Sequence, residues 1–252
     1  MEAIERHQLI AERVRLQGTA TVAELADELA TSAVTVRRDL ADLEKLGVLR
    51  RTRGGAENAL LRAEEFPYAF RAMTSSAAKD RIAAAAAELI RDGEAVVVDS
   101  GTTGLAAARA LADRTLTVLP LSVQQIGILA TSERIRLLLP GGEVRPGEGS
   151  VVGPLAERTL SAYRFDTFLM TVCGVSAEAG VTAYDVQDAA VKQTAAQQSA
   201  RVIAIADGSK LTVTAMAHVL DVAEITTLIT DATAPARPVD LLQRAGVDVV
   251  RV

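Results

Sequence analysis

The sequence predicts an α/β protein, with a small domain of three helices and a hairpin followed by a larger domain built on a mostly parallel sheet. Two observations support this fold class. The first 55 or so residues carry helical periodicity with clear cap signals. The remainder alternates short runs of Val, Ile and Leu with segments of helical length, which is typical of buried parallel strands. With 252 residues, 49% of them hydrophobic, the chain is long enough for both domains.

The first two predicted helices are defined by apolar spacing and by their ends. Helix one contains Leu9, Ile10 and Val14 and ends near Gly18. Helix two opens with Thr21-Val22-Ala23-Glu24, the pattern of a capping box, in which the two polar side chains bond free N–H groups of the first turn. Its apolar positions form one stripe at i, i+3, i+4 and i+7, namely Val22, Leu25, Ala26 and Leu29.

The third predicted helix has a buried face and a basic face. After a break around 30–32, a buried stripe made of Val36, Leu40, Leu43 and Leu46 leads to a stop at Gly47. On a helical wheel, Arg38 and Lys45 lie nearly opposite Val36, with Arg37 on the flank. Residues 48–55 then read as two short strands with a basic rim.

The charge distribution points to a local anionic partner. The chain carries a net charge of −5, yet residues 37–53 contain six basic and three acidic side chains. Arginine reaches guanine edges or phosphates, and small neighbours let a helix approach the major groove. We therefore expect the third helix to bind duplex DNA. The alternative is a solvated helix face without a partner.

The sequence predicts a first domain over 1–56, a linker with a short helical piece over 57–76, and the larger domain over 77–252. A helix is predicted over 77–91 and another over 103–111. The apolar runs predicted as strands are 95–99, 116–119, 135–139, 167–173, 202–207, 227–230 and 247–250.

Composition excludes several classes of protein. One Cys and two His cannot form an internal disulfide or a usual structural zinc site. Four Phe, three Tyr and no Trp argue against a stacking platform for single strands. The charged start shows no secretory signal, and polar residues interrupt the longest charge-free run, 115–132. We expect a cytoplasmic protein without a membrane partner.

A phosphate-binding loop is predicted where the first strand of the larger domain ends. Ligands of open α/β sheets bind beyond the carboxyl ends of the strands. The segment 99–104 places small and hydroxyl residues between a strand and a helix, so its backbone N–H groups could meet a phosphate. It matches neither GxGxxG nor GxxxxGK[ST], so no nucleotide cofactor is expected. A purely structural glycine-rich connection is the alternative.

The N-terminal residues carry a specific resemblance. Arg6, Ile10, Val14, Ser32 and the run 35–40 resemble the helix-turn-helix signature of the DeoR family of bacterial transcriptional regulators, and 43–56 is similar to that family's wing. The resemblance implies a winged helix-turn-helix whose third helix reads the operator. We expect the acidic Asp39 on that surface to orient one of the arginines, and the alternative is an ordinary surface charge. The predicted DNA-binding residues are Thr21, Ser32, Val34, Thr35, Arg37, Arg38, Lys45, Arg50, Arg51 and Arg53.

The larger domain resembles the DeoR effector domain through 79–82, 99–103, 140–142, 180–182 and 207–210. The resemblance implies a Rossmann-like fold related to sugar-phosphate isomerases that binds phosphorylated sugars or related metabolites. Its loop 100–103 would hold the phosphate, and charged residues would pair with each other or with sugar hydroxyls. The effector-binding residues that it implies are Lys79, Asp99, Ser100, Gly101, Thr102, Thr103, Gly141, Gly142, Asp185, Lys192, Asp207 and Lys210.

Two positions depart from the family pattern. Leu121 stands before Ser122, where the family usually has Asn, and Cys173 stands before Gly174, where it usually has Asn or Asp. Both changes remove a polar group from the expected edge of the pocket.

The sequence thus predicts a transcriptional repressor of a carbohydrate-metabolism operon whose affinity for operator DNA is controlled by a phosphorylated sugar. It is not expected to be an enzyme or to need a cofactor or metal. Contacts from paired helices imply a homodimer or higher homo-oligomer. The alternatives are a sugar-phosphate isomerase-like enzyme and a regulator whose C-terminal domain only oligomerises.

Overall fold

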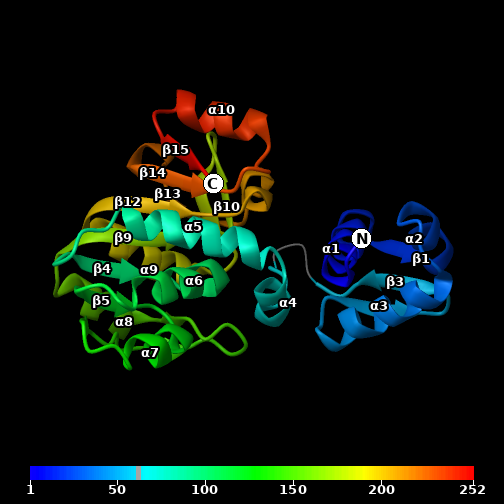
Figure 1. Cartoon of the computed structure of the whole chain (residues 1–252), viewed down its shortest axis with the longest axis horizontal. Coiled ribbons are helices and arrows are strands. Elements are labelled where there is room, and N and C mark those ends of the chain that lie inside the picture. The colour runs from blue at the N-terminus through cyan, green and yellow to red at the C-terminus, as the bar shows by residue number, and fades with distance from the viewer. Residues whose placement is uncertain (61–63) are drawn as a thin grey trace. The chain divides into compact units, whose positions relative to one another are not determined.

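A computed structural model describes residues 1–60 and 64–252 of the chain, which divides into two compact units, Met1–Ser75 and Ser76–Val252 (Figure 1). No helix in these two ranges is both long and apolar enough to cross a bilayer.

The N-terminal unit combines helices with a three-stranded antiparallel sheet of order β1-β3-β2. Its elements are α1 (Ala3–Gln17), β1 (Thr19–Thr21), α2 (Val22–Glu28), α3 (Ala33–Lys45), β2 (Leu49–Thr52), β3 (Gly55–Asn58) and α4 (Tyr68–Met73). The predicted capping box is confirmed, because the Glu24 backbone N–H donates to Thr21 Oγ1 and the Thr21 N–H donates to the Glu24 carboxylate. Strand β1, which the sequence did not predict, pairs with β3.

The core of this unit confirms the predicted stripe of the third helix. Val36, Leu40 and Leu43 are buried, while Leu46 is only partly buried. They pack with side chains of α1, α2 and β2 and with Phe70 of α4. The predicted linker, 57–76, therefore contains a helix that belongs to the N-terminal core; residues 61–63 of that linker lie outside the described part. The boundaries of 1–56 and 77–252 remain predictions.

The C-terminal unit is built on a seven-stranded parallel sheet of order β15-β14-β12-β9-β4-β5-β6. The seven strands correspond to the seven predicted apolar runs, so the predicted fold class is confirmed. They are β4 (Ala95–Val98), β5 (Leu116–Pro120), β6 (Ile135–Leu137), β9 (Phe165–Thr171), β12 (Ser199–Ile205), β14 (Thr227–Thr230) and β15 (Asp248–Arg251).

Helices cover both faces of this sheet (Figure 1). They are α5 (Ser76–Glu88), α6 (Gly101–Leu111), α7 (Val123–Leu129), α8 (Pro154–Ser161), α9 (Val186–Gln197) and α10 (Ala236–Arg244), with short 3-10 helices η1 (Gly208–Thr212) and η2 (Val222–Glu224). Alternate residues of one strand enter different cores. In β4, Val96 and Val98 pack with α5 and α6, whereas Val97 packs with α8 and α9 on the other face.

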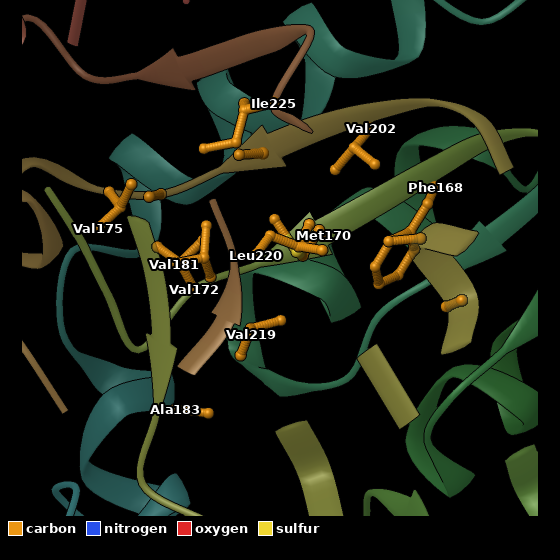
Figure 2. Close-up of a cluster of buried hydrophobic side chains, with 14 of the residues drawn as sticks. Phe168, Met170, Val172, Val175, Val181, Ala183, Val202, Val219, Leu220 and Ile225 are labelled. Atoms are coloured by element: carbon orange, nitrogen blue, oxygen red, sulfur yellow. The ribbon is translucent and has the colours of Figure 1, made fainter. Parts of the chain in front are cut away.

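Two small antiparallel sheets complete the unit. They are β7 (Glu143–Val144) with β8 (Val151–Val152), and β10 (Gly174–Ser176) with β11 (Gly180–Ala183) and β13 (Ala217–Leu220). Figure 2 shows how the second of these is attached: apolar side chains of β9 and β12, among them Met170, share one cluster with side chains of β10, β11 and β13, such as Leu220.

The sheet has a topological switch point between β4 and β9. From β4 the chain proceeds to β5 and β6 on one side, whereas β9, β12, β14 and β15 follow on the other. Such a point leaves a crevice outside the carboxyl ends of the two central strands, which is where open α/β sheets bind ligands.

Candidate DNA-binding surface and effector site

The outward face of α3 carries two arginines that no other group of the described residues engages. Arg37 and Arg38 are exposed, and neither has an ion pair or side-chain hydrogen bond within 1–60 and 64–252. Beside them Val34 is 73% exposed, so a small apolar group lies at the start of the same face. Unpaired cations and small neighbours are the features that the major groove requires of a recognition helix.

The start of α3 is held by a side-chain cap. Ser32 Oγ accepts a hydrogen bond of 3.1 Å from the Thr35 backbone N–H, and the two hydroxyls lie 2.9 Å apart. This cap orders the first turn of the helix, next to Val34. Thr21 plays the same part for α2, so these three predicted hydroxyl residues have a structural role whether or not they touch DNA.

The predicted cations of the wing and of the end of α3 differ in their partners. Arg50 pairs with Glu57, Arg51 lies 3.9 Å from Glu44, and Lys45 lies 3.2 Å from Asp42. Arg53, at the tip of the hairpin, is exposed and has no such partner in the described part of the chain. Because exposed ion pairs contribute little, the paired cations can exchange an acid for a phosphate at small cost.

Asp39 does not lie on the DNA-facing surface, and that expectation was wrong. The residue is only 3% exposed and faces α1. Arg6 Nε and Nη2 donate to its two oxygens at 2.6 and 2.9 Å, and His7 Nε2 lies 3.1 Å away. These hydrogen bonds raise the pKa of Arg6 above its ordinary value. Asp39 thus orients an arginine, but that arginine is Arg6 of α1, and the pair anchors α3 to α1.

Replacing Arg6 with alanine is expected to weaken the attachment of α3 to α1. The variant leaves the buried Asp39 carboxylate without its bidentate partner, and breaking such a pair costs about 3–5 kcal/mol of folding free energy. Hydrogen–deuterium exchange of peptides from α1 and α3 in the full chain measures the effect. Arg13→Ala is the matched control, because the Arg13–Glu28 pair on the same helix is partly exposed and is worth at most about 1 kcal/mol. Equal protection of α3 in both variants would contradict the assignment.

The effector candidates converge at the switch point of the sheet. Asp99 follows β4 and is buried. Its Oδ1 accepts from the Ser100 N–H at 2.8 Å. Its Oδ2 accepts from the Thr171 N–H and hydroxyl, both at 2.9 Å, and from Lys192 Nζ at 2.7 Å. The carboxylate is therefore occupied by donors of β9 and α9, and it ties the three elements together.

Lys192 is similarly occupied. Its side chain is 3% exposed, and Nζ contacts Asp99 Oδ2, the Thr171 carbonyl oxygen at 3.0 Å and Asp188 Oδ2 at 3.4 Å. Burial lowers the pKa of Lys192, but the Asp188 and Asp99 carboxylates outweigh burial, so the pKa lies above its ordinary value. The ammonium group is a fixed cation at the centre of the site.

Asp188 and Thr171 were not predicted as site residues. Asp188 is buried, and burial, assisted by Asp99, raises the pKa of its carboxyl despite the opposing effect of Lys192. A signal for Asp188 was present in the sequence, because it precedes Lys192 by four residues and therefore lies on the same face of α9. Thr171 lies within the predicted run 167–173, but nothing in that run marks its hydroxyl as a partner of Asp99.

The start of α6 leaves donors available beside this cluster. Ser100 is the N-cap residue, yet its side chain makes no capping hydrogen bond. The hydroxyls of Ser100 and Thr103 have no hydrogen-bond partner among the described residues, although both residues are more than nine-tenths buried. A Cβ at Gly104 would collide with the Asp99 carbonyl oxygen, so glycine allows the helix to pack closely against the loop. Free N–H and O–H groups at a helix N-terminus suit a phosphate.

The other predicted effector residues have contacts elsewhere. The Gly141 N–H donates to Thr159 Oγ1, and Gly142 packs against β8. Asp185 caps α9 and lies 3.4 Å from Arg145, while Asp207 caps η1. Lys79 is buried on α5, and Lys210 lies on η1. Their roles as effector ligands remain predictions.

The two positions that depart from the family pattern have different surroundings. Leu121 is buried in the hydrophobic core. Cys173 is partly buried, and its thiol is close enough to Lys192 to contribute to the raised pKa of that ammonium group.

Comparison with known proteins identifies both units. The model of the DeoR-like helix-turn-helix domain matches residues 6–59, and that of the DeoR C terminal sensor domain matches residues 74–232. The HTH-type transcriptional repressor GlcR of Bacillus subtilis is 35% identical over 98% of this chain and 95% of its own length. The transcriptional repressor AccR of Agrobacterium fabrum is 31% identical over 90% and 89%, respectively. The glycerol-3-phosphate regulon repressor of Escherichia coli is 29% identical over 96% of both chains.

The helix-turn-helix match covers the capped helix α3 with Arg37 and Arg38, and the sensor match covers the cluster of Asp99, Asp188 and Lys192. Together with the full-length relatives, these matches show that the chain belongs to the DeoR family of helix-turn-helix transcriptional regulators.

Proposed function

We propose that this protein represses a carbohydrate-metabolism operon and that the concentration of a phosphorylated sugar controls its affinity for the operator. The observation that carries the proposal is the pair Arg37 and Arg38, exposed on a capped helix without a partner among the described residues, in a chain that also has a sensor domain. The repressor relatives support it, and one of them is named for a phosphorylated metabolite.

We further propose that two copies bind one operator in the cytoplasm. A recognition helix reads about one half-site, and a second copy supplies the second helix at the spacing of one helical turn of DNA. An effector changes operator affinity only if it binds the DNA-competent and the incompetent arrangements with different affinities.

The charged residues of the site support sensing over catalysis. A proton-transfer catalyst needs a carboxylate or amine that is free to exchange a proton with its substrate. Here Asp99 and Lys192 are 2.7 Å apart and use their remaining donors and acceptors on Thr171, Ser100 and Asp188. We therefore expect neither Asp99 nor Lys192 to catalyse aldose–ketose interconversion, and Asp188 is the group that a turnover assay with a sugar phosphate would test.

The test is operator binding by the purified full chain. Fluorescence anisotropy with duplexes from the region upstream of its own gene is expected to show binding at least about 1,000-fold tighter than to a scrambled duplex. The affinity should fall linearly with salt on logarithmic axes. Mass photometry of the complex is expected to show two chains per duplex. Equal affinity for both duplexes would contradict the proposal, and steady turnover of a sugar phosphate would favour the enzyme alternative.

A further inference from the structure

Within the charged cluster of the sensor unit, Asp188 is the residue whose carboxylate still has room for a ligand. Asp99 has four hydrogen bonds to its two oxygens, and each N–H of Lys192 has an acceptor within 3.4 Å. The Asp188 carboxylate, by contrast, has one ion pair, from Oδ2 to Lys192, and no hydrogen bond from another group of the described residues. Its side chain retains 11% exposure, compared with 1% for Asp99 and 3% for Lys192.

We infer that the effector presents a hydrogen-bond donor, a hydroxyl or an ammonium group, to Asp188, and that the site takes phosphorylated sugars whose end remote from the phosphate carries no negative charge. The inference rests on the proposed function, because it specifies the class of molecule that the sensor recognises.

The charges around Asp188 exclude a second anion. Asp99 and Asp188 both contact Lys192, and Arg145, which also acts on the Asp188 carboxyl through its charge, pairs with a third carboxylate, Asp185, at 3.4 Å. One carboxylate is therefore in excess in a buried environment, where a further anion is repelled more strongly than in water. Burial also raises the pKa of Asp188, and Lys192 and Arg145 oppose this shift without cancelling it. A donor from the ligand compensates the remaining charge.

The phosphate end of the same ligand has its own partners. Ser100 and Thr103, each more than nine-tenths buried, have hydroxyls with no partner in the described part of the chain. Thr171 Oγ1 lies 3.0 Å from the Ser100 carbonyl oxygen and 2.9 Å from Asp99 Oδ2, so its one proton is shared between these acceptors, and it accepts from Lys192 Nζ at 3.4 Å. The loop that holds the phosphate is thereby linked through Thr171 to the cluster that contains Asp188.

The experiment compares four probes that share a phosphate: glucose 6-phosphate, glucosamine 6-phosphate, 6-phosphogluconate and inorganic phosphate. Isothermal titration on the full chain is expected to show that glucose 6-phosphate and glucosamine 6-phosphate bind at least about 10-fold tighter than 6-phosphogluconate and inorganic phosphate do. Asp188→Asn is expected to remove this preference, and Asp188→Glu to retain it. Asp240→Asn, which removes an exposed acid on α10 that pairs with Arg244, is the matched control.

Each outcome of these titrations either supports or overturns the inference about Asp188. The inference is overturned if 6-phosphogluconate binds wild type as well as glucose 6-phosphate does, or if Asp188→Asn keeps the preference. If the variants at Asp188 fail to fold, as circular dichroism would show, the ranking of the four probes on wild type decides alone. If no sugar phosphate binds although the operator is bound, the inference fails while the DNA-binding part of the proposed function stands. Loss of operator recognition would instead be a failure of the proposed function.

Discussion

Arg37→Ala and Arg38→Ala are each expected to weaken operator binding by about 1–3 kcal/mol, or roughly 5- to 150-fold. Both guanidinium groups are exposed and have no hydrogen bond or ion pair within the described residues. Binding to DNA therefore breaks no existing interaction of these side chains. Their full donor capacity is therefore available to guanine edges or phosphates. Because the folded N-terminal unit does not use these side chains, its stability should change by no more than about 0.5 kcal/mol.

Two measurements separate the kinds of contact that these arginines make. If an arginine contacts a phosphate, its removal weakens binding to all duplexes and lowers the slope of log affinity against log salt by about 1. If it contacts a base, its removal relaxes discrimination at one position of the operator. Arg244→Ala serves as the control, since Arg244 lies on α10 and is 76% exposed. Wild-type affinity and salt slope in both α3 variants would mean that α3 is not the recognition helix.

The third helix could be predicted because its signals are local. A cap residue, an apolar stripe and a glycine stop lie within 16 residues of sequence, from Ser32 to Gly47. That Asp39 lies on the buried face of the helix could also have been predicted, because a residue three positions after Val36 lies on the same helix face. Because its side chain is acidic, Asp39 was instead expected to be exposed to solvent. Burial of that acid depends on Arg6, which lies 33 residues earlier, and no local pattern specifies such a partner.

The parallel sheet and the small sheet differ in how far they could be predicted. Strands buried on both faces produce continuous apolar runs, and these runs correspond to the seven parallel strands. Strands β10 and β11 have three and four residues and begin at Gly174 and Gly180. Their third partner, β13, lies more than 30 residues later in the chain. Short strands interrupted by glycine give too little periodicity for a strand to be recognised.

The effector site was predictable at the level of strand ends but not of pairings. The rule that ligands bind at the carboxyl edge of a parallel sheet drew attention to Asp99, which lies in the buried charged cluster with Lys192. The rule does not indicate that Lys192, 93 residues later, donates a hydrogen bond to Asp99. This pairing leaves neither charged group free for a ligand. Which polar group remains open to a ligand therefore follows only from an account of every hydrogen bond in the cluster.

Lys192→Met is expected to lower the unfolding free energy of the C-terminal unit by about 3–5 kcal/mol. Methionine fills a similar volume, so packing changes little, but Asp99 and Asp188 are left buried without a cation. An uncompensated buried charge of this kind is the costly case, far above the cost of losing an exposed pair. Thermal unfolding monitored by circular dichroism measures the loss. Lys45→Met is the matched control, because the Lys45 side chain is 76% exposed.

The pH dependence provides an independent check on the cause. The pKa of Lys192 is raised, so in wild type its contribution is fully present below the unfolded pKa, near 10.4, and is lost only as pH rises through the folded value. In Lys192→Met the Asp188 carboxyl, whose pKa is already raised by burial, loses the opposing effect of the ammonium group, and its pKa should rise further. A group shifted in this direction favours the folded state at low pH and loses that contribution as pH rises.

The difference in unfolding free energy between variant and wild type should therefore be smaller at about pH 4 than at about pH 7. Adding Asp188→Asn to the variant should remove part of this difference at neutral pH. A difference that is independent of pH and unaffected by the second substitution would show that Lys192 acts through packing, because a packing defect does not respond to protonation of a carboxylate.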